Sequence, residues 1–135
     1  FDKIIHLKEG KDILLDSGET LLNKNFTNVS KPPKSYAYCS DTRFSSTLSS
    51  KIKKVDVLYH EATYCEKHKE IAARTGHSTT KEAAEIAKNA KVNRLIIGHY
   101  SKRYSELDKL LIECKEKFDN TFLANEGDFL DFDTI

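Results

Sequence analysis

The amino-acid sequence predicts an α/β fold in which a largely parallel sheet is covered by helices. Three short apolar segments, at 35–40, 55–59 and 94–98, have the length and composition of buried strands. Helical patterns alternate with these segments, and the clearest of them occupy 79–91 and 104–118. Strands that alternate with helices form β-α-β units, and the strands of such units run parallel. At 135 residues, the chain has the size of one such domain.

The first part of the chain, 1–35, is expected to be an appendage made of a hairpin and a connector. Residues 12–22 contain two apolar stretches around Ser17 and Gly18, a pair that is typical of a tight turn. The KPP sequence at 31–33 predicts an extended connector, because each proline biases the residue before it away from helix. The α/β domain is therefore expected to follow this connector and to fill the rest of the chain, 36–135.

Three helices are predicted in the α/β domain. A weak helical signal lies in the Ser-rich segment 45–53. The strongest helix, 79–91, is rich in alanine, and Thr79 and Glu82 have the spacing of a capping box at its start. The segment 104–118 places its leucines on one helical face.

The C-terminal segment 121–132 is predicted to form one or two strands around a Glu-Gly turn. The predicted order of the domain is therefore β-α-β-α-β-α-β, preceded by the N-terminal hairpin.

Composition excludes several classes of protein. The formal net charge is +1, so a nucleic-acid partner would have to be held by a local patch. No apolar run has the length of a membrane span, and no signal peptide is visible. The three cysteines have no paired spacing, which favours free thiols in a reducing cytoplasm. The chain contains no methionine, so we expect it to be a piece of a longer product.

Ionisable side chains follow each of the three predicted strands. Asp41 follows the first strand, His60 and Glu61 follow the second, and His99 follows the third. Chemistry in parallel sheets collects at the carboxyl ends of the strands, so these side chains are expected to face one crevice. A lone histidine there is as often only a polar strand end, and an aspartate often only caps a turn. Asp41 and His99 together supply half of a zinc site.

His77 lies directly before the strongest helix, in the sequence GHSTTKEAA. The unpaired N–H groups of a helix start, with the hydroxyls of Ser78 and Thr79, form a prepared place for a phosphate. A histidine at this place can protonate a leaving oxygen, and a carboxylate such as Glu61 can hold its tautomer. The alternative is a simple helix cap with an incidental histidine.

Arg103 and Lys102 supply cations just past His99, and an arginine can grip a phosphate through two nitrogens. The alternative for both is a solvated loop. Cys65 and His68 have the C-x-x-H spacing of some zinc sites, but no second pair follows, so we give them no role.

Four motifs in this order resemble the C-terminal half of ribonuclease Z, a tRNA 3′-processing endoribonuclease of the metallo-β-lactamase superfamily. The motifs are SDTR at 40–43, HEATY at 60–64, GHSTTKEAA at 76–84 and GHYSKRY at 98–104. The resemblance implies the C-terminal half of an αββα sandwich, with 1–35 as the return of the substrate-binding arm.

The resemblance also implies roles for individual residues. Asp41 corresponds to a carboxylate that bridges two zinc ions, and His99 to a ligand of one of them. His77 corresponds to the residue that protonates the leaving 3′ oxygen, and Glu61 to the partner that orients it, with His60 in support. In the same scheme, contacts to substrate phosphates would come from Arg103, Ser78 and Thr79. The implied reaction is attack of an activated water on a phosphodiester of precursor tRNA.

One departure from the family is large. The family's main metal motif, H-x-H-x-D-H, is absent from this sequence. Two zinc ions are therefore expected in an intact enzyme, which the family forms as a homodimer, but poor zinc binding and no catalysis are expected of this chain alone. A half sandwich also leaves a sheet face without cover, which predicts self-association.

Two other readings remain open at this stage. One is a different metallo-β-lactamase-fold phosphodiesterase. The other is a non-catalytic α/β binding module, either receiver-like with Asp41 as phospho-acceptor or an interaction domain that has lost catalysis. A receiver would need an acidic pair near its first strand and a lysine where His99 stands.

Overall fold

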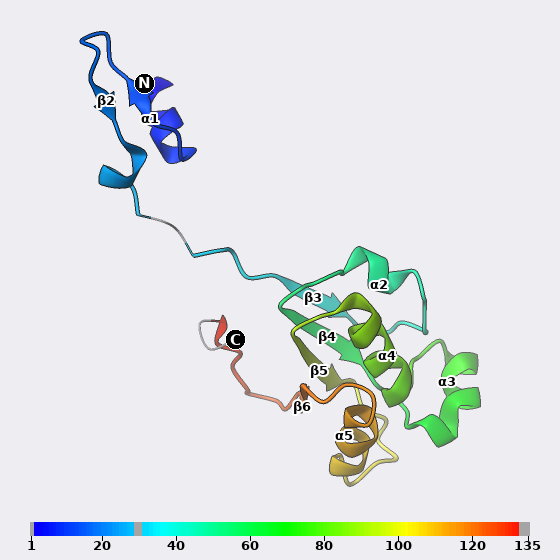
Figure 1. Ribbon diagram of the computed structural model, residues 1–135. Coiled ribbons are helices and arrows are strands. Elements are labelled where there is room, and N and C mark those ends of the chain that lie inside the picture. Colours follow the sequence, from blue (N-terminus) through cyan, green and yellow to red (C-terminus); the bar gives the residue numbers. More distant parts are fainter. Residues whose placement is uncertain (1, 29–30, 133–135) are drawn as a thin grey trace. The chain divides into compact units, whose positions relative to one another are not determined.

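The computed structural model describes residues 2–28 and 31–132, which form two compact units, Phe1–Pro33 and Lys34–Ile135 (Figure 1). In the first unit, helix α1 (Asp2–Lys8) precedes an antiparallel pair of short strands, β1 (Ile13–Leu14) and β2 (Thr20–Leu21). The predicted hairpin is therefore present. A 3-10 turn, η1 (Asn23–Asn25), follows it, and helix α1 was not predicted.

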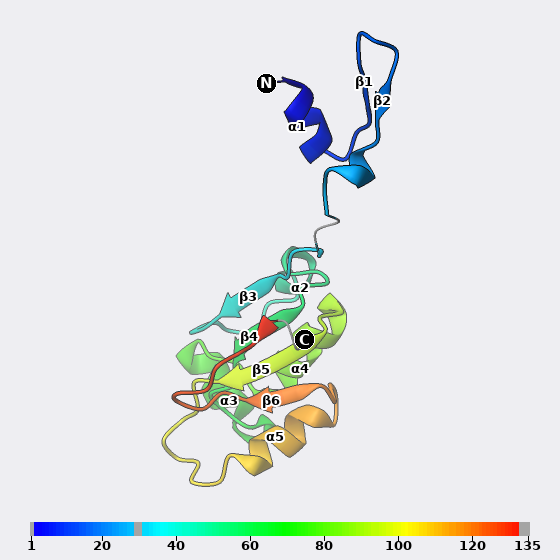
Figure 2. The same ribbon diagram turned by 90° about the vertical axis from the view of Figure 1, so that its left-hand side faces the viewer.

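The second unit is the predicted α/β domain. Its strands are β3 (Tyr36–Cys39), β4 (Val57–Glu61), β5 (Arg94–Gly98) and β6 (Thr121–Leu123), and they form one parallel sheet in the order β3-β4-β5-β6. Its helices are α2 (Leu48–Lys51), α3 (Lys69–Thr75), α4 (Thr80–Ala90) and α5 (Asp108–Lys115), with a 3-10 turn η2 (Glu66–His68) before α3. Figure 2 shows the helices behind the sheet.

The core lies between the sheet and helix α4. Leu58, Leu95 and Ile97 point from the strands toward the helix and are fully buried. Helix α4 meets them with a face of small residues, four alanines among them, so its backbone can approach the sheet closely. The predicted capping box is confirmed, because Thr79 and Glu82 each accept a hydrogen bond from the other's backbone N–H.

The other face of the sheet carries aromatic side chains that remain open to solvent. Tyr38 stacks on Tyr59 with ring centroids 4.6 Å apart, yet Tyr38 keeps 63% of its surface exposed. The segment that follows β6 crosses this face, and Phe132 packs edge-on against Tyr36 (Figure 2). Among the described residues of the α/β unit, no helix covers this face.

Three predictions about elements were too long or incomplete. Helix α2 occupies only part of 45–53, and α5 begins four residues after the start of 104–118. Within 121–132, only the first three residues form a strand, because the chain leaves the sheet and turns at Gly127 with φ 86°. The sequence interpretation also missed α3, which ends at Gly76 in the left-handed conformation.

Two further findings concern the cysteines and the length of the helices. The three cysteines are free thiols. Among the described residues, no helix combines the length and the apolar character needed to cross a bilayer.

Candidate functional site

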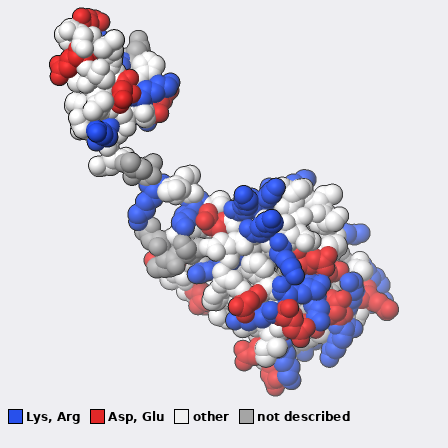
Figure 3. Space-filling model, viewed as in Figure 1, with Lys and Arg blue, Asp and Glu red and all other residues white. Residues whose placement is uncertain are grey.

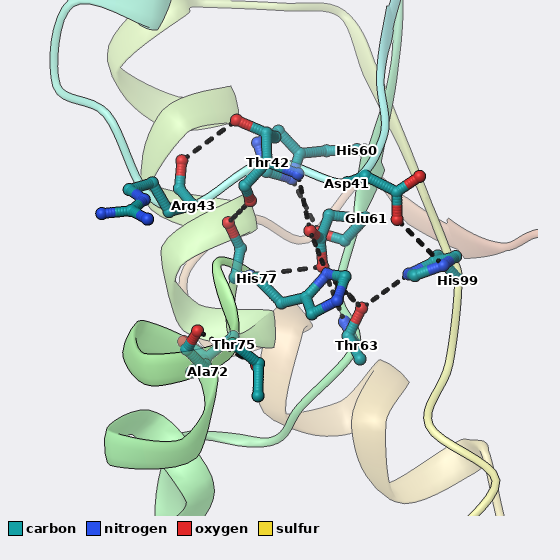
Figure 4. A network of polar contacts seen from close by, with 12 residues as sticks. Asp41, Thr42, Arg43, His60, Glu61, Thr63, Ala72, Thr75, His77 and His99 are labelled. Atoms are coloured by element: carbon teal, nitrogen blue, oxygen red, sulfur yellow. Dashed lines mark hydrogen bonds and ion pairs between the residues drawn. The ribbon is translucent and has the colours of Figure 1, made fainter.

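The predicted convergence of strand ends is present in the structure. Strands β3, β4 and β5 are parallel and in register, with Cys39 opposite His60 and Glu61 opposite Gly98. Their carboxyl ends therefore meet at one edge of the sheet. At that edge, Nε2 of His99 lies 3.1 Å from Oδ1 of Asp41 (Figure 4).

The carboxylate of Glu61 lies beneath these side chains and organises them. It is fully buried and accepts hydrogen bonds from the N–H groups of Thr42 (2.8 Å) and Ser78 (3.2 Å) and from the hydroxyl of Thr63 (2.6 Å). Nδ1 of His77 lies 2.8 Å from Glu61 Oε1, the oxygen that also accepts from Thr42, as the sequence interpretation expected. Burial raises the pKa of Glu61, but the hydrogen bonds from Thr63, His77 and Ser78 outweigh it and hold the pKa below its ordinary value.

Thr63, which the sequence interpretation did not single out, links Glu61 to His99. Its hydroxyl oxygen lies 2.6 Å from Glu61 Oε2 and 2.8 Å from Nδ1 of His99. An ionised carboxylate only accepts, so the hydroxyl proton goes to Glu61 and the oxygen accepts from His99 Nδ1–H. In a neutral imidazole this relay places the proton on Nδ1, so that the lone pair of Nε2 is aimed at the Asp41 carboxylate.

A lone pair facing a carboxylate oxygen at 3.1 Å needs a positive charge between the two atoms, and either a proton on Nε2 or a metal ion supplies it. Two ligands of one zinc ion, each about 2.0–2.2 Å from it at a tetrahedral angle, lie about 3.4 Å apart. The separation of Asp41 and His99 is therefore compatible with a shared zinc ion.

His77 belongs to the same group of donors. One donor atom each from Asp41, His77 and His99 lies within 4.8 Å of the others, and the two imidazole centroids are 5.2 Å apart. Two imidazole nitrogens and a carboxylate oxygen are donors that zinc prefers. The residues present thus fit a zinc ion, but they leave its four-coordinate shell incomplete.

The backbone is strained at Asp41 and His99, two of the three candidate metal donors. Asp41 has φ 48° and His99 has φ 59°, in the left-handed region that costs most residues about 1 kcal/mol or more. Gly98 adds a close approach, because a Cβ at this position would clash with the hydroxyl of Tyr59. Asp41 and His99 are two of the four non-glycine residues with positive φ among the described residues, and backbone strain of this kind is common at functional sites.

Ser78 and Thr79 do not offer their hydroxyls to a substrate, which corrects the sequence interpretation. Both residues are fully buried. The Ser78 hydroxyl donates to the carbonyl of Thr42 (2.6 Å), and the Thr79 hydroxyl donates to Glu66 (2.7 Å). Both hydroxyls therefore hold the loop before α4 in place instead of facing solvent.

His60 lies on the helix-covered face of the sheet, away from the donors. It is fully buried, and its Nδ1–H donates to the Glu61 carbonyl (2.7 Å). Its Nε2 is buried with no hydrogen-bond partner among the described residues. Burial lowers the pKa of His60, so it is neutral and supports the strand end only indirectly.

Arg103 is exposed, and the ring of Tyr64 lies close both to its guanidinium group and to the ring of His77. Its guanidinium carbon is 5.2 Å from the Tyr64 ring centroid, and the Tyr64 ring is 6.2 Å from that of His77. The pair that received no role, Cys65 and His68, is in contact, with Sγ 3.4 Å from Nδ1. This pair has no third metal-ligating side chain close by within the described ranges.

Comparison with known proteins agrees with this geometry. A family model described as "Beta-lactamase superfamily domain" matches residues 26–100. Ribonuclease Z of Porphyromonas gingivalis strain W83 is 48% identical over 118 residues, covering 87% of this chain and 39% of that protein. Ribonuclease Z of Parabacteroides distasonis is 46% identical over 121 residues, covering 90% of this chain and 40% of that protein. The chain thus spans about two fifths of the length of these relatives.

Solved structures show the same fold. The metallo-beta-lactamase fold protein YhfI from Bacillus subtilis superposes with a TM-score of 0.64 at 22% identity, over 70% of this chain and 38% of that one. A long form RNase Z from yeast gives a TM-score of 0.51 at 32% identity, over 53% of this chain and 10% of that chain. The chain belongs to the beta-lactamase superfamily, and it resembles the C-terminal region of ribonuclease Z.

Proposed function

We propose that this chain is the C-terminal part of a zinc-dependent endoribonuclease that removes the 3′ trailer of precursor tRNA. The observation that carries the proposal is the meeting of donor atoms from Asp41, His77 and His99 within 4.8 Å. The buried Glu61 carboxylate supports this arrangement from below. The ribonuclease Z relatives support the assignment of precursor tRNA as substrate.

Each side chain has a role in this proposal. Asp41 and His99 hold the metal, and zinc bound there supplies a Lewis acid that activates water for attack on a phosphodiester. His77 donates a proton to the leaving 3′ oxygen through the nitrogen that Glu61 does not engage. Glu61 and Thr63 hold the tautomers of the two imidazoles. Arg103 contacts a substrate phosphate.

The chain alone is proposed to be inactive. Asp41 and His99 alone leave a zinc shell incomplete, so zinc binds weakly until the H-x-H-x-D-H half of the enzyme adds its ligands. The free thiols support a cytoplasmic location. The intact enzyme is proposed to be a homodimer.

The exposed aromatic face supports self-association of the isolated chain. Tyr36, Tyr38 and Phe122 keep 48%, 63% and 44% of their surfaces exposed. Apolar side chains gathered on one open sheet face favour association with another surface.

A cleavage assay tests the proposed function. The 135-residue chain is joined to the H-x-H-x-D-H half of a ribonuclease Z relative and given zinc. We expect release of the 3′ trailer from a precursor tRNA transcript, with no cleavage by the 135-residue chain alone. Asp41→Asn is expected to lower the rate at least 100-fold, since asparagine tolerates the left-handed backbone but is a poorer zinc ligand.

The same assay separates the alternatives. Fast hydrolysis of bis(p-nitrophenyl) phosphate without cleavage of precursor tRNA would point to another phosphodiesterase of this fold. If the Asp41→Asn variant keeps the wild-type rate, the assignment of Asp41 to the catalytic site is wrong. A joined protein that binds zinc and cleaves neither substrate would favour a binding module.

A further inference from the structure

Five exposed lysines gather at the end of the sheet opposite the candidate metal site. The turn 52–55 lies against the C-terminal end of α4, since Lys54 N–H donates to the carbonyl of Ala90 (2.8 Å) and Asn93 N–H to that of Val55 (3.1 Å). The side chains that we call the lysine patch come from this turn, from the last residue of α2 and from the end of α4. They are Lys51, Lys53, Lys54, Lys88 and Lys91, and all are exposed.

The charge of the lysine patch is not neutralised by neighbouring acids. Within 2–28 and 31–132, no ion pair or side-chain hydrogen bond engages any of the five ammonium groups. The nearest acid along the chain, Asp56, accepts hydrogen bonds from Ser35 and lies 3.7 Å from Lys34. Figure 3 shows a group of basic side chains over this part of the α/β unit.

Other lysines of the same unit behave differently. Lys69, Lys81, Lys109 and Lys117 each lie 2.8–3.2 Å from a glutamate oxygen. The chain carries almost equal numbers of acids and bases, so a group of five unpaired lysines is a local excess against a neutral background.

Helix capping explains only part of the lysine patch. Lysines near helix C-termini interact favourably with the last carbonyls, which accounts for Lys51 in α2 and Lys88 in α4. Lys54 and Lys91, however, adopt φ of 61° and 55°, where glycine or asparagine is the usual residue. The choice of lysine at these positions adds charge at a cost in backbone energy.

The position of the lysine patch limits the kind of partner it suits. The lysines precede β4 and β5, whereas Asp41 follows β3 and His99 follows β5, at the opposite end of the parallel sheet. The five residues of β4 span about 16 Å, so one small phosphodiester cannot reach both places. A partner that touches both must be a polymer with repeated negative charge.

We propose that the lysine patch binds the phosphodiester backbone of the RNA substrate at a distance from the scissile bond. This inference rests on the proposed function, which supplies the RNA. Contacts between lysines and phosphates release counterions, so they provide affinity and orientation without reading sequence. The lysine patch thus supplies the local basic surface that a chain of net charge +1 needs to hold a nucleic acid.

The test measures RNA binding by the 135-residue chain in three forms. The first is wild type, and the second is the patch variant Lys51→Gln, Lys53→Gln, Lys88→Gln, which leaves both left-handed positions unchanged. The third is the matched control Lys81→Gln, Lys109→Gln, Lys117→Gln, which removes the same charge from lysines that are paired with glutamates. Fluorescence anisotropy with a labelled precursor tRNA transcript gives the affinity between about 50 and 200 mM salt.

The patch variant is expected to bind at least tenfold more weakly at the lowest salt. The plot of log affinity against log salt should become shallower by about 2 to 3 units, since each lost phosphate contact removes about 0.7–0.9. The control should bind as wild type does.

Three outcomes would overturn the proposal: no RNA binding by wild type, equal weakening in the control, or equal binding of poly-glutamate. None of these outcomes bears on the proposed function, which is tested by cleavage of precursor tRNA in the joined protein. Asp41→Asn should lower cleavage by the joined protein at least 100-fold, and that rate is a readout separate from the RNA affinity measured here.

Discussion

Glu61→Ala is expected to lower the free energy of unfolding of the α/β unit by about 3–5 kcal/mol. The carboxylate is the shared acceptor for the half-buried N–H group of Thr42, the buried N–H group of Ser78 and the buried hydroxyl of Thr63. Removing it leaves these donors without partners, and each buried donor left unsatisfied costs about 1–3 kcal/mol. Urea denaturation followed by circular dichroism at pH 7 measures the change.

The control is Glu106→Ala, which removes a carboxylate from an exposed ion pair with Lys109 and should leave stability nearly unchanged. The pH dependence gives a second readout. Since the pKa of Glu61 is lowered in the folded state, its stabilisation is present above the pKa of the unfolded chain and is lost as pH falls through the folded pKa. Glu61→Ala should lack this contribution. Equal stability of both variants would show that the carboxylate does not organise the loop.

His77→Ala is expected to lower cleavage of precursor tRNA by about 10²–10⁴-fold in the joined protein, the usual effect of losing a general acid. The reason is the contact of His77 Nδ1 with Glu61, which leaves the other ring nitrogen for proton donation. His77 also lies among the metal donors, so zinc affinity must be measured on the same variant.

A proton donor and a metal ligand give different results in this experiment. If His77 donates the proton, His77→Ala loses cleavage while the zinc affinity changes only a few-fold. If His77 binds the metal, both fall together, and the assignment as proton donor is wrong. His68→Ala is the control, because His68 contacts Cys65 and Tyr104 and none of the described site residues.

The arrangement of the site was predictable because it follows from the direction of the strands. Asp41, Glu61 and His99 end three apolar segments, and parallel strands place such ends at one edge. Thr63 was missed, although a signal was present. It lies two residues after Glu61, and side chains two apart on extended chain point to the same side.

Burial at the start of α4 was not predictable from the local sequence. The pattern HSTTKEAA has the same form whether the helix start is open or covered. In this fold Glu61 and Thr42 engage Ser78, and Glu66 engages Thr79, and these partners lie 13 to 36 residues away along the chain. Such contacts depend on tertiary packing, which local sequence patterns do not describe.

The lysine patch was hidden for a similar reason. Its members come from two segments about 40 positions apart in the sequence, and they meet only because the turn 52–55 packs on the end of α4. The C-terminal segment was also misjudged, since 124–132 has apolar residues typical of a strand but crosses the sheet as irregular chain.

Zinc titration of the 135-residue chain by isothermal calorimetry tests the central claim, that Asp41 and His99 bind one metal ion together. We expect a single weak site in wild type, at least 100-fold weaker in Asp41→Asn and in His99→Asn. Both replacements tolerate the left-handed backbone, so the fold is retained. Zinc binding of wild-type strength in both variants would contradict the claim.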